Sequence, residues 1–210
     1  MPCRVAITLS SPFTRKWIAE RLERSLGQMQ DDPLLPRYTH PPGRTVVPAA
    51  VLVPLVNRPA GMRVLFTRRT DHLHDHAGQV SFPGGRVEER DSDRAATALR
   101  EAEEETGLSR DRVQVLGHLP DYDILTGFRV TPVVGWVEPP FRLSPDPFEV
   151  AQMFEVPLEF FLEPANHERQ SRVVNGVERH YYVMPYEGWN IWGATAGILY
   201  SLYQALTRDQ

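Results

Sequence analysis

One run of the chain, residues 82–108, restricts the fold more than any other, because it joins a glycine-rich turn to an acidic helix. It reads FPGGRVEERDSDRAATALREAEEETGL. In the expected helix, Glu101, Glu104 and Glu105 stand at i, i+3 and i+4, a spacing that places three carboxylates on one face. Like charges at this spacing repel by about 0.2–0.5 kcal/mol per pair. A hard divalent cation such as Mg²⁺ takes oxygen ligands and would relieve that repulsion.

The alternative interpretation of such a helix is a solvated acidic face, and three neighbouring features favour the cation site instead. The turn at 82–85 contains two glycines, which let the backbone approach a ligand closely. Gly107 stands where a helix C-cap is expected. Arg100 lies beside Glu101 and one turn from Glu104, so it can hold a carboxylate that the metal does not use.

Residues 100–108, REAEEETGL, resemble the second half of the Nudix box, Arg-Glu-apolar-any-Glu-Glu-any-Gly-apolar, at every fixed position. The first half of that box normally reads Gly, five residues, Glu, seven residues, Arg. Here five residues separate Gly85 from Asp91, and eight separate Asp91 from Arg100. The chain therefore has one inserted residue, and an aspartate stands where glutamate is usual. Both departures lie in the loop before the helix and leave the carboxylate helix intact.

A second motif, at residues 65–85, resembles the signature found upstream of the box in coenzyme A pyrophosphatases. It reads LFTRRTDHLHDHAGQVSFPGG, and its matching positions are Leu65, Thr67, Arg69, Gly78, Phe82, Pro83, Gly84 and Gly85. Phe66 and Thr70 replace other residue types, and His74 stands where Arg or Lys is common. A neutral histidine contributes less positive charge toward a phosphate than either.

The resemblance implies an α/β (α+β) fold, a Nudix-type α/β/α sandwich with a mixed sheet. The box at 84–108 would form a loop–helix–loop motif within one domain spanning 1–210, preceded by a helix and an extended arm over 1–45. It implies Mg²⁺- or Mn²⁺-dependent hydrolysis of the diphosphate of coenzyme A or a derivative, giving 3′,5′-ADP and 4′-phosphopantetheine or its acyl form. Two alternatives stay open: hydrolysis of another nucleoside diphosphate derivative, such as ADP-ribose or a dinucleotide, and a Nudix-fold binding module without catalysis.

The metal-dependent hydrolysis that the resemblance implies assigns a role to each carboxylate. Glu101 and Glu105, one helical turn apart, are the expected direct metal ligands. Glu104 is either a third ligand or the base that takes a proton from the nucleophile, and Glu149 is a second candidate for the base, with an ordinary loop carboxylate as the equal alternative. Gly85 is expected to offer backbone to the metal or a phosphate.

Substrate contacts are expected around the second motif. Either Arg69 or Arg68 can hold a phosphate, since neighbours in a strand point to opposite faces. Trp192 and Tyr200 are candidates for stacking on adenine or, as often for aromatic residues, for the core. The substrate-binding candidates are Arg69, His74, Gln79 and Gly84.

Charge and composition limit the classes of partner and the location expected for the protein. The formal net charge of −4 argues against broad binding to nucleic acid. No apolar run approaches the roughly 18–20 residues needed to span a membrane. The single cysteine, Cys3, cannot form an internal disulfide, which suits a reducing, cytoplasmic location. A small nucleotide is the expected partner, and a homodimer stays open.

Periodicity and turn residues predict a mixed sheet with helices on both faces. The polar loop at 70–81 carries three histidines, interpreted as facing an anionic substrate and not as a metal site. The proline-rich stretch at 139–147 is interpreted as a substrate lid or a spacer. The expected elements are a helix at 12–28, a linker or arm at 29–45, strands at 46–56, 62–68, 112–119 and 128–138, a short helix within 148–162, a hairpin at 172–186 turning at Asn175-Gly176, and a helix at 193–206.

Overall fold

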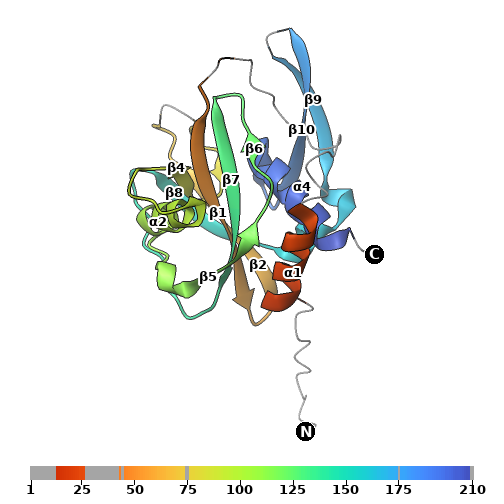
Figure 1. Ribbon diagram of the computed structural model, residues 1–210. Helices are drawn as coiled ribbons and strands as arrows, with labels where there is room; N and C mark the ends of the chain where they lie inside the picture. The colour runs from red at the N-terminus through yellow and green to blue at the C-terminus, as the bar shows by residue number, and fades with distance from the viewer. Residues whose placement is uncertain (1–12, 27–42, 44, 74–75, 175, 209–210) are drawn as a thin grey trace.

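The core of the protein is a twisted mixed sheet with helices on both faces (Figure 1). The computed structural model describes residues 13–26, 43, 45–73, 76–174 and 176–208. Its helices are α1 (Arg15–Leu26), α2 (Arg94–Thr106), α3 (Leu158–Leu162) and α4 (Ala194–Thr207), with 3₁₀ turns η1 (Arg110–Arg112) and η2 (Pro164–Asn166). Its strands are β1 (Val47–Arg58), β2 (Gly61–Arg69), β3 (Val80–Ser81), β4 (Gly84–Arg86), β5 (Val113–His118), β6 (Tyr122–Asp123), β7 (Phe128–Val137), β8 (Val150–Pro157), β9 (Glu168–Val174), β10 (Val177–Tyr186) and β11 (Trp189–Trp192).

Strands β1 and β7 form the centre of the sheet and run parallel, in a register from Val47–Phe128 to Val56–Val137. The other pairs are antiparallel, and the described strands follow the order β3-β2-β1-β7-β5, with β4 added on β1, β6 on β7 and β8 on β2. Central strands are covered on both faces, which explains the nearly unbroken apolar sequence of β1.

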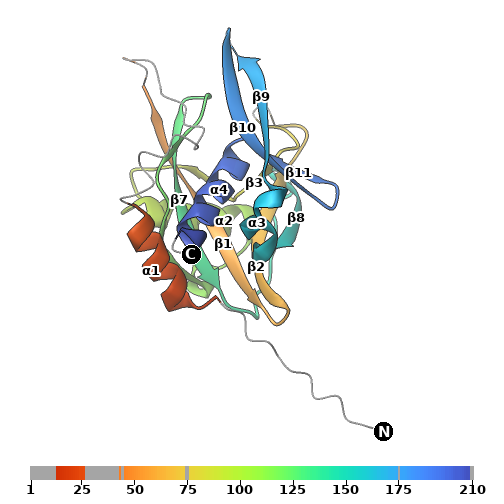
Figure 2. The ribbon, with the colours of Figure 1, turned by 90° about the vertical axis from the view of Figure 1, so that its right-hand side faces the viewer.

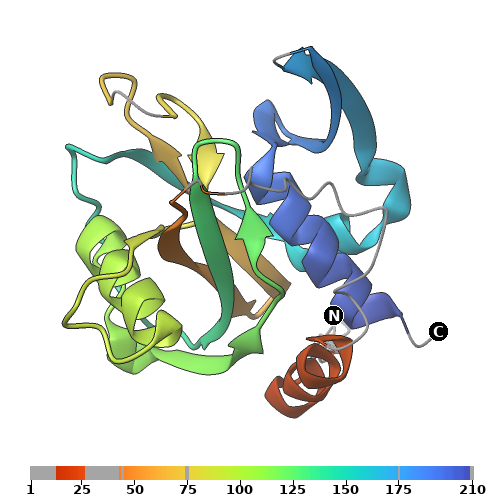
Figure 3. The same ribbon diagram turned by 45° about the horizontal axis from the view of Figure 1, so that its top comes forward.

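The two faces of the sheet carry separate clusters of buried side chains. Along β1, Ala50, Leu52 and Val56 pack on the α2 side, whereas Val53 and Leu55 lie on the opposite side. Alternate residues of a strand point to opposite faces, so one strand contributes to both clusters. Figure 3 shows the layers, with α2 on one side of the sheet and α1 and α4 on the other. The expected α/β/α sandwich with a mixed sheet is therefore confirmed.

A second sheet, β11-β10-β9, is built by the C-terminal part of the described chain. Strands β9 and β10 form the expected hairpin, which rises away from the helices (Figure 2). It is longer than its turn signal indicated, beginning at Glu168, and its turn residue Asn175 lies outside the described residues. Helix α4 packs against β10 and β11 and thereby attaches this sheet to the main one.

Most other expected elements are also confirmed, but β8 and the short strands β3, β4, β6 and β11 were not expected, and β3 forms the end of the expected loop at 70–81. The short helix within 148–162 is α3, but it is preceded by the unpredicted strand β8, which pairs with β2. Glutamate and glutamine side chains in that segment obscured the strand, because β8 lies beyond β2 and has exposed positions. Of the expected arm at 29–45, only residues 43 and 45 lie within the described residues.

Candidate active site

Helix α2 begins and ends at residues suited to those positions. The side chain of Asp93 accepts a hydrogen bond from the Ala96 N–H at 2.7 Å, which caps the first turn. Gly107 adopts φ 70°, a left-handed conformation that favours glycine, and its N–H donates to the Glu103 carbonyl at 2.9 Å. The expected glycine C-cap is confirmed, so both ends of the carboxylate helix are fixed.

Arg100 joins the helix to the loop before it. The side chain is only 7% exposed, and its Nε and Nη2 donate to the two carboxylate oxygens of Asp91 at 2.9 and 3.0 Å. Its Nη1 donates to Glu101 at 2.8 Å and to Glu104 at 3.0 Å, and Nη2 also donates to the Arg86 carbonyl. The hydrogen bonds from Arg100 hold the pKa of Asp91 well below its usual range.

The acids that line the cavity include Glu101, Glu105 and Glu149. Burial, followed by repulsion from Glu149, raises the pKa of Glu105 to about 8; Arg69 and a backbone hydrogen bond from Gly84 oppose the shift. Burial also raises the pKa of Glu101, against the hydrogen bond from Arg100. The positive charge near Glu101 and Glu105 therefore does not offset the cost of burying these two carboxylates.

Glu104 lies elsewhere. Its side chain is 52% exposed and pairs with Arg90 at 3.3 Å and Arg100 at 3.0 Å, outside the cavity lining that the described residues form. The structure therefore brings together Glu101, Glu105 and Glu149, and it leaves Glu104 on the outer side of Arg100.

The donor set fits a divalent cation in its chemistry. Carboxylate oxygens are hard ligands, and a cation would offset both the burial and the repulsion from Glu149 that raise the pKa of Glu105. Within the described ranges, no group of three or more acidic, histidine or cysteine side chains is already arranged to hold an ion. Arg100 still binds one oxygen of Glu101, so that carboxylate would share its two oxygens between the guanidinium and a cation.

Gly84 and Gly85 allow the backbone of β4 to lie close to the backbone of β1 and to the carboxylate of Glu101. In the register with β1, Gly85 stands opposite Ala50. A Cβ on Gly85 would lie 2.5 Å from the Glu101 carboxyl carbon, and one on Gly84 would lie 2.4 Å from the Ala50 carbonyl oxygen. Only glycine permits this close approach of a strand to the carboxylate helix.

The proline-rich segment at 139–149 is hydrogen-bonded to the C-terminal end of α2. The N–H groups of Ser144 and Asp146 donate to the carbonyls of Thr106 and Glu105 at 2.8 and 2.9 Å. Glu149 follows, and its carbonyl accepts from the Thr70 N–H at 3.0 Å. The proline-rich stretch thus places Glu149 relative to the helix, which favours the spacer interpretation over a lid.

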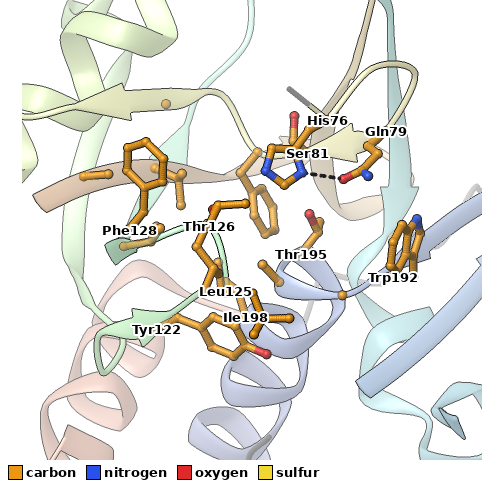
Figure 4. A pocket seen from close by; sticks show the side chains of 18 of the residues that line it. His76, Gln79, Ser81, Tyr122, Leu125, Thr126, Phe128, Trp192, Thr195 and Ile198 are labelled. Atoms are coloured by element: carbon orange, nitrogen blue, oxygen red, sulfur yellow. Dashed lines mark hydrogen bonds between the residues drawn. The ribbon is translucent and has the colours of Figure 1, made fainter. Parts of the chain in front are cut away.

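The cavity has a volume of about 990 Å³ and is lined by several parts of the chain (Figure 4). The box supplies Gly84, Gly85, Glu101 and Glu105, and the second motif supplies Arg69 and Gln79. Figure 4 shows His76 and Gln79 side by side, joined by a hydrogen bond of 3.0 Å, with Trp192 nearby.

The candidate substrate residues fall into three groups. Arg69 and Gln79 line the cavity, whereas Arg68 forms an ion pair with Asp71 at 2.7 Å. Of the aromatic pair, Trp192 lines the cavity and Tyr200 stacks on Tyr182 at a centroid distance of 4.2 Å. His74 lies outside the described residues.

Sequence reasoning missed the basic side chains that β9 and β10 bring to the cavity, Arg169, Arg172 and Arg179. The hairpin itself was expected, but nothing local indicates where it lies. The available signal was the repeated arginine of ERQSRVVNGVERH, residues 168–180.

A family model described as the NUDIX domain matches residues 46–175, more than half of the chain. The chain belongs to the Nudix family. The Nudix match ends at residue 175, between β9 and β10. All of β10, together with β11 and α4, therefore lies beyond the match, although these elements line the same cavity.

A Nudix relative from Escherichia coli K12, named "Uncharacterized Nudix hydrolase NudL", is 44% identical over 156 residues, 73% of this chain and 80% of the relative. NudL of Shigella boydii serotype 18 gives the same figures. Among solved structures, a C. elegans Ap4A hydrolase binary complex has a TM-score of 0.46 at 18% identity, covering 53% of this chain and 80% of that one. RenU, a Nudix hydrolase from M. smegmatis, has a TM-score of 0.46 at 22% identity, covering 55% and 72%. These two structural likenesses are too distant to bear on function.

The Nudix resemblance drawn from the box is confirmed, and so is the coarser enzyme class, a Nudix hydrolase. Nudix hydrolases generally use divalent metal ions, in agreement with the carboxylate cluster. Within the described part of the chain, no helix combines the length and apolar character needed to cross a membrane.

Proposed function

We propose that this Nudix hydrolase cleaves the diphosphate of coenzyme A or a derivative, releasing 3′,5′-ADP and 4′-phosphopantetheine or its acylated form. One observation carries the proposal: the segment that resembles the coenzyme A signature lines the same cavity as the carboxylates, through Arg69, Gln79 and Gly84. A substrate diphosphate at Glu101 and Glu105 would therefore touch that segment. The lone Cys3 supports a cytoplasmic setting for the same activity.

Glu101 and Glu105 are the proposed holders of a Mg²⁺ or Mn²⁺ ion, with Gly85 supplying backbone beside them. When bound, the ion neutralises phosphate charge and lowers the pKa of a water molecule. Glu149 is favoured over Glu104 as the base, since Glu149 faces the cavity and Glu104 is engaged by two arginines. In this scheme Glu104 positions Arg100, which in turn positions Glu101.

Arg69 is the proposed phosphate-binding cation. Its Nε is buried and has no hydrogen-bond partner within the described residues, and Nη1 lies 4.0 Å from a Glu149 oxygen. A buried donor without a partner is costly, and a phosphate oxygen would satisfy it with a charge-assisted bond.

The test is product analysis after incubation with coenzyme A, ADP-ribose and a dinucleotide, with Mg²⁺, with Mn²⁺ and with a chelator. We expect metal-dependent release of 3′,5′-ADP from coenzyme A, much faster than cleavage of the other two. Preferential cleavage of ADP-ribose or the dinucleotide would reject the coenzyme A assignment. Absence of any turnover would leave a Nudix-fold binding module as the better account.

Substitutions of the cavity carboxylates assign the roles. Glu149→Gln should lower kcat by roughly 10²–10⁴-fold, the usual range for a lost acid–base group, and Glu105→Gln should lower kcat by removing a metal ligand. Glu103→Gln is the matched control, because Glu103 pairs with Arg110 at 2.7 Å, away from the cavity. Full turnover in Glu101→Gln combined with Glu105→Gln would reject the proposal that α2 holds the metal.

A further inference from the structure

The hairpin wall of the cavity contains two arginines in directly paired positions. Arg172 on β9 stands opposite Arg179 on β10, and both line the cavity. Like charges directly opposite on an antiparallel pair are destabilising. An anion between them would remove that repulsion, as a cation would at the carboxylate end.

Aromatic rings lie beside this pair. The Arg172 guanidinium carbon is 5.7 Å from the Tyr181 ring centroid and 5.4 Å from that of Trp192, which faces the cavity. The two rings are 5.9 Å apart. A planar base and a phosphate are the two groups that such an arrangement of ring and guanidinium accommodates.

One acid of the hairpin also lines the cavity, but it lies on the other face of the ribbon. Glu178 is adjacent to Arg179 in sequence and pairs in register with Val173, so strand alternation directs it away from the arginine pair. It accepts a hydrogen bond from the Ser171 hydroxyl at 2.7 Å. The face that carries Arg172 and Arg179 is therefore positive, opposite in sign to the carboxylate end.

The cavity is large enough for a ligand with more than a diphosphate. About 990 Å³ lies at the upper end of the range of about 300–1,000 Å³ typical of small-molecule sites. A ligand that fills it reaches from the carboxylates to the hairpin.

We propose that Arg172 and Arg179, with Trp192 beside them, form a second anion subsite that binds a phosphomonoester on the nucleoside, remote from the diphosphate that is cleaved. The inference rests on the proposed function for its substrate: in coenzyme A this group is the 3′-phosphate of the ribose. The subsite selects nucleotides that carry the additional phosphate over those that lack it.

Binding of 3′,5′-ADP and of AMP, measured by titration calorimetry, tests the subsite without turnover. The wild-type protein should bind 3′,5′-ADP about ten-fold or more tightly than AMP, the ratio expected of a charge-assisted contact. Arg172→Gln combined with Arg179→Gln should abolish this ratio and change AMP affinity by less than about three-fold. Arg172→Lys, which keeps the charge but loses the planar fork, should retain part of it.

Arg110→Gln combined with Arg112→Gln is the control for net charge, because both arginines are exposed and lie outside the cavity lining. It should leave the ratio unchanged. Equal affinity for the two nucleotides in the wild type, or a ratio that survives the double substitution, would overturn the subsite. Failure to cleave coenzyme A would reject the proposed function alone, since the binding ratio is measured independently of turnover.

Discussion

Arg100 shows how a single side chain organises the catalytic helix. It is nearly inaccessible, yet it donates to carboxylates on the loop before α2 and on α2 itself. A buried charge is tolerated when it is paired and hydrogen-bonded, and breaking such a pair leaves an uncompensated charge. The stability of the helix and the position of Glu101 therefore depend on the same contacts.

Asp91 should resist replacement even by glutamate, the residue usual at this position of the box. Its side chain is 4% exposed and accepts hydrogen bonds from Arg100, Thr97 and the Glu88 N–H. Asp91→Glu adds a methylene to a filled site, and Asp91→Ala removes every bond. We expect both to lower the thermal unfolding midpoint, Asp91→Ala more than Asp91→Glu, measured by circular dichroism.

Asp111→Ala provides the comparison, because Asp111 is an exposed acid on η1. Its midpoint should match the wild type. If Asp91→Glu also matched the wild type, the loop would have to adapt to the longer acid, and the argument from packing would be wrong.

At this scale the sequence was informative where chemistry is local. Spacing alone predicted that Arg100 would reach Glu101 and Glu104, and it predicted the cap at Gly107. It did not separate Glu149 from an ordinary loop acid. The side chain of Glu149 reaches the cavity through hydrogen bonds between a distant loop and the end of α2, and no local pattern records such contacts.

Among the elements, β4 is short, yet it sets the distance between the sheet and the carboxylate helix. Its two glycines face different obstacles: backbone of β1 for Gly84 and the Glu101 carboxylate for Gly85. Backbone cannot move aside without disturbing the sheet, whereas a side-chain end can. Substitution by alanine should therefore have different effects at the two positions.

Gly84→Ala should destabilise the protein, by roughly 1–3 kcal/mol as for other overpacked sites. Gly85→Ala should cost less stability but displace the Glu101 carboxylate, with a fall in kcat of about 10²-fold for a misplacement on the order of 1 Å. Urea unfolding and steady-state kinetics on the same two proteins measure both effects. Equal losses of stability and activity in the two variants would contradict the assignment.

The elements also show what periodicity can reveal. The strands at 46–56, 62–68 and 128–138 were predictable because their apolar patterns reflect burial, whereas the strand at 112–119 was predicted although no residue of β5 is buried. Strand β8 was missed, since much of it is exposed and its sequence mixes acid with large apolar residues. The location of the β9–β10 hairpin beside the cavity depends on the packing of α4, and such long-range contacts leave no periodic signal.

For the molecule as a whole, the buried acid Glu105 makes stability depend on pH. Its pKa is about 8 when folded and about 4.5 ordinarily. Between these values the unfolded chain releases a proton that the folded chain retains, so the contribution of Glu105 to the free energy of unfolding falls as pH rises. Below about pH 4.5 the residue contributes nothing, and above about pH 8 the loss is complete.

Without metal, the wild-type protein should therefore lose stability relative to Glu105→Gln as pH increases from about 5 to 8. Mg²⁺ should stabilise the wild type, by about 2.7 kcal/mol at a hundred times its dissociation constant, and should affect Glu105→Gln much less. Thermal melts in chelator and in Mg²⁺ at several pH values measure both. Parallel curves for the two proteins would show that Glu105 neither titrates in this range nor binds the ion.

The hydrogen bonds from Ser144 and Asp146 to the end of α2 have a consequence for comparing relatives. Because of these hydrogen bonds, the length of the segment at 139–149 determines where Glu149 lies with respect to Glu105. A homologue with the same box but a segment of another length would carry its second acid at a different place. In an alignment, a gap here would therefore mark a change in the enzyme's reactive geometry, although the box itself remained identical.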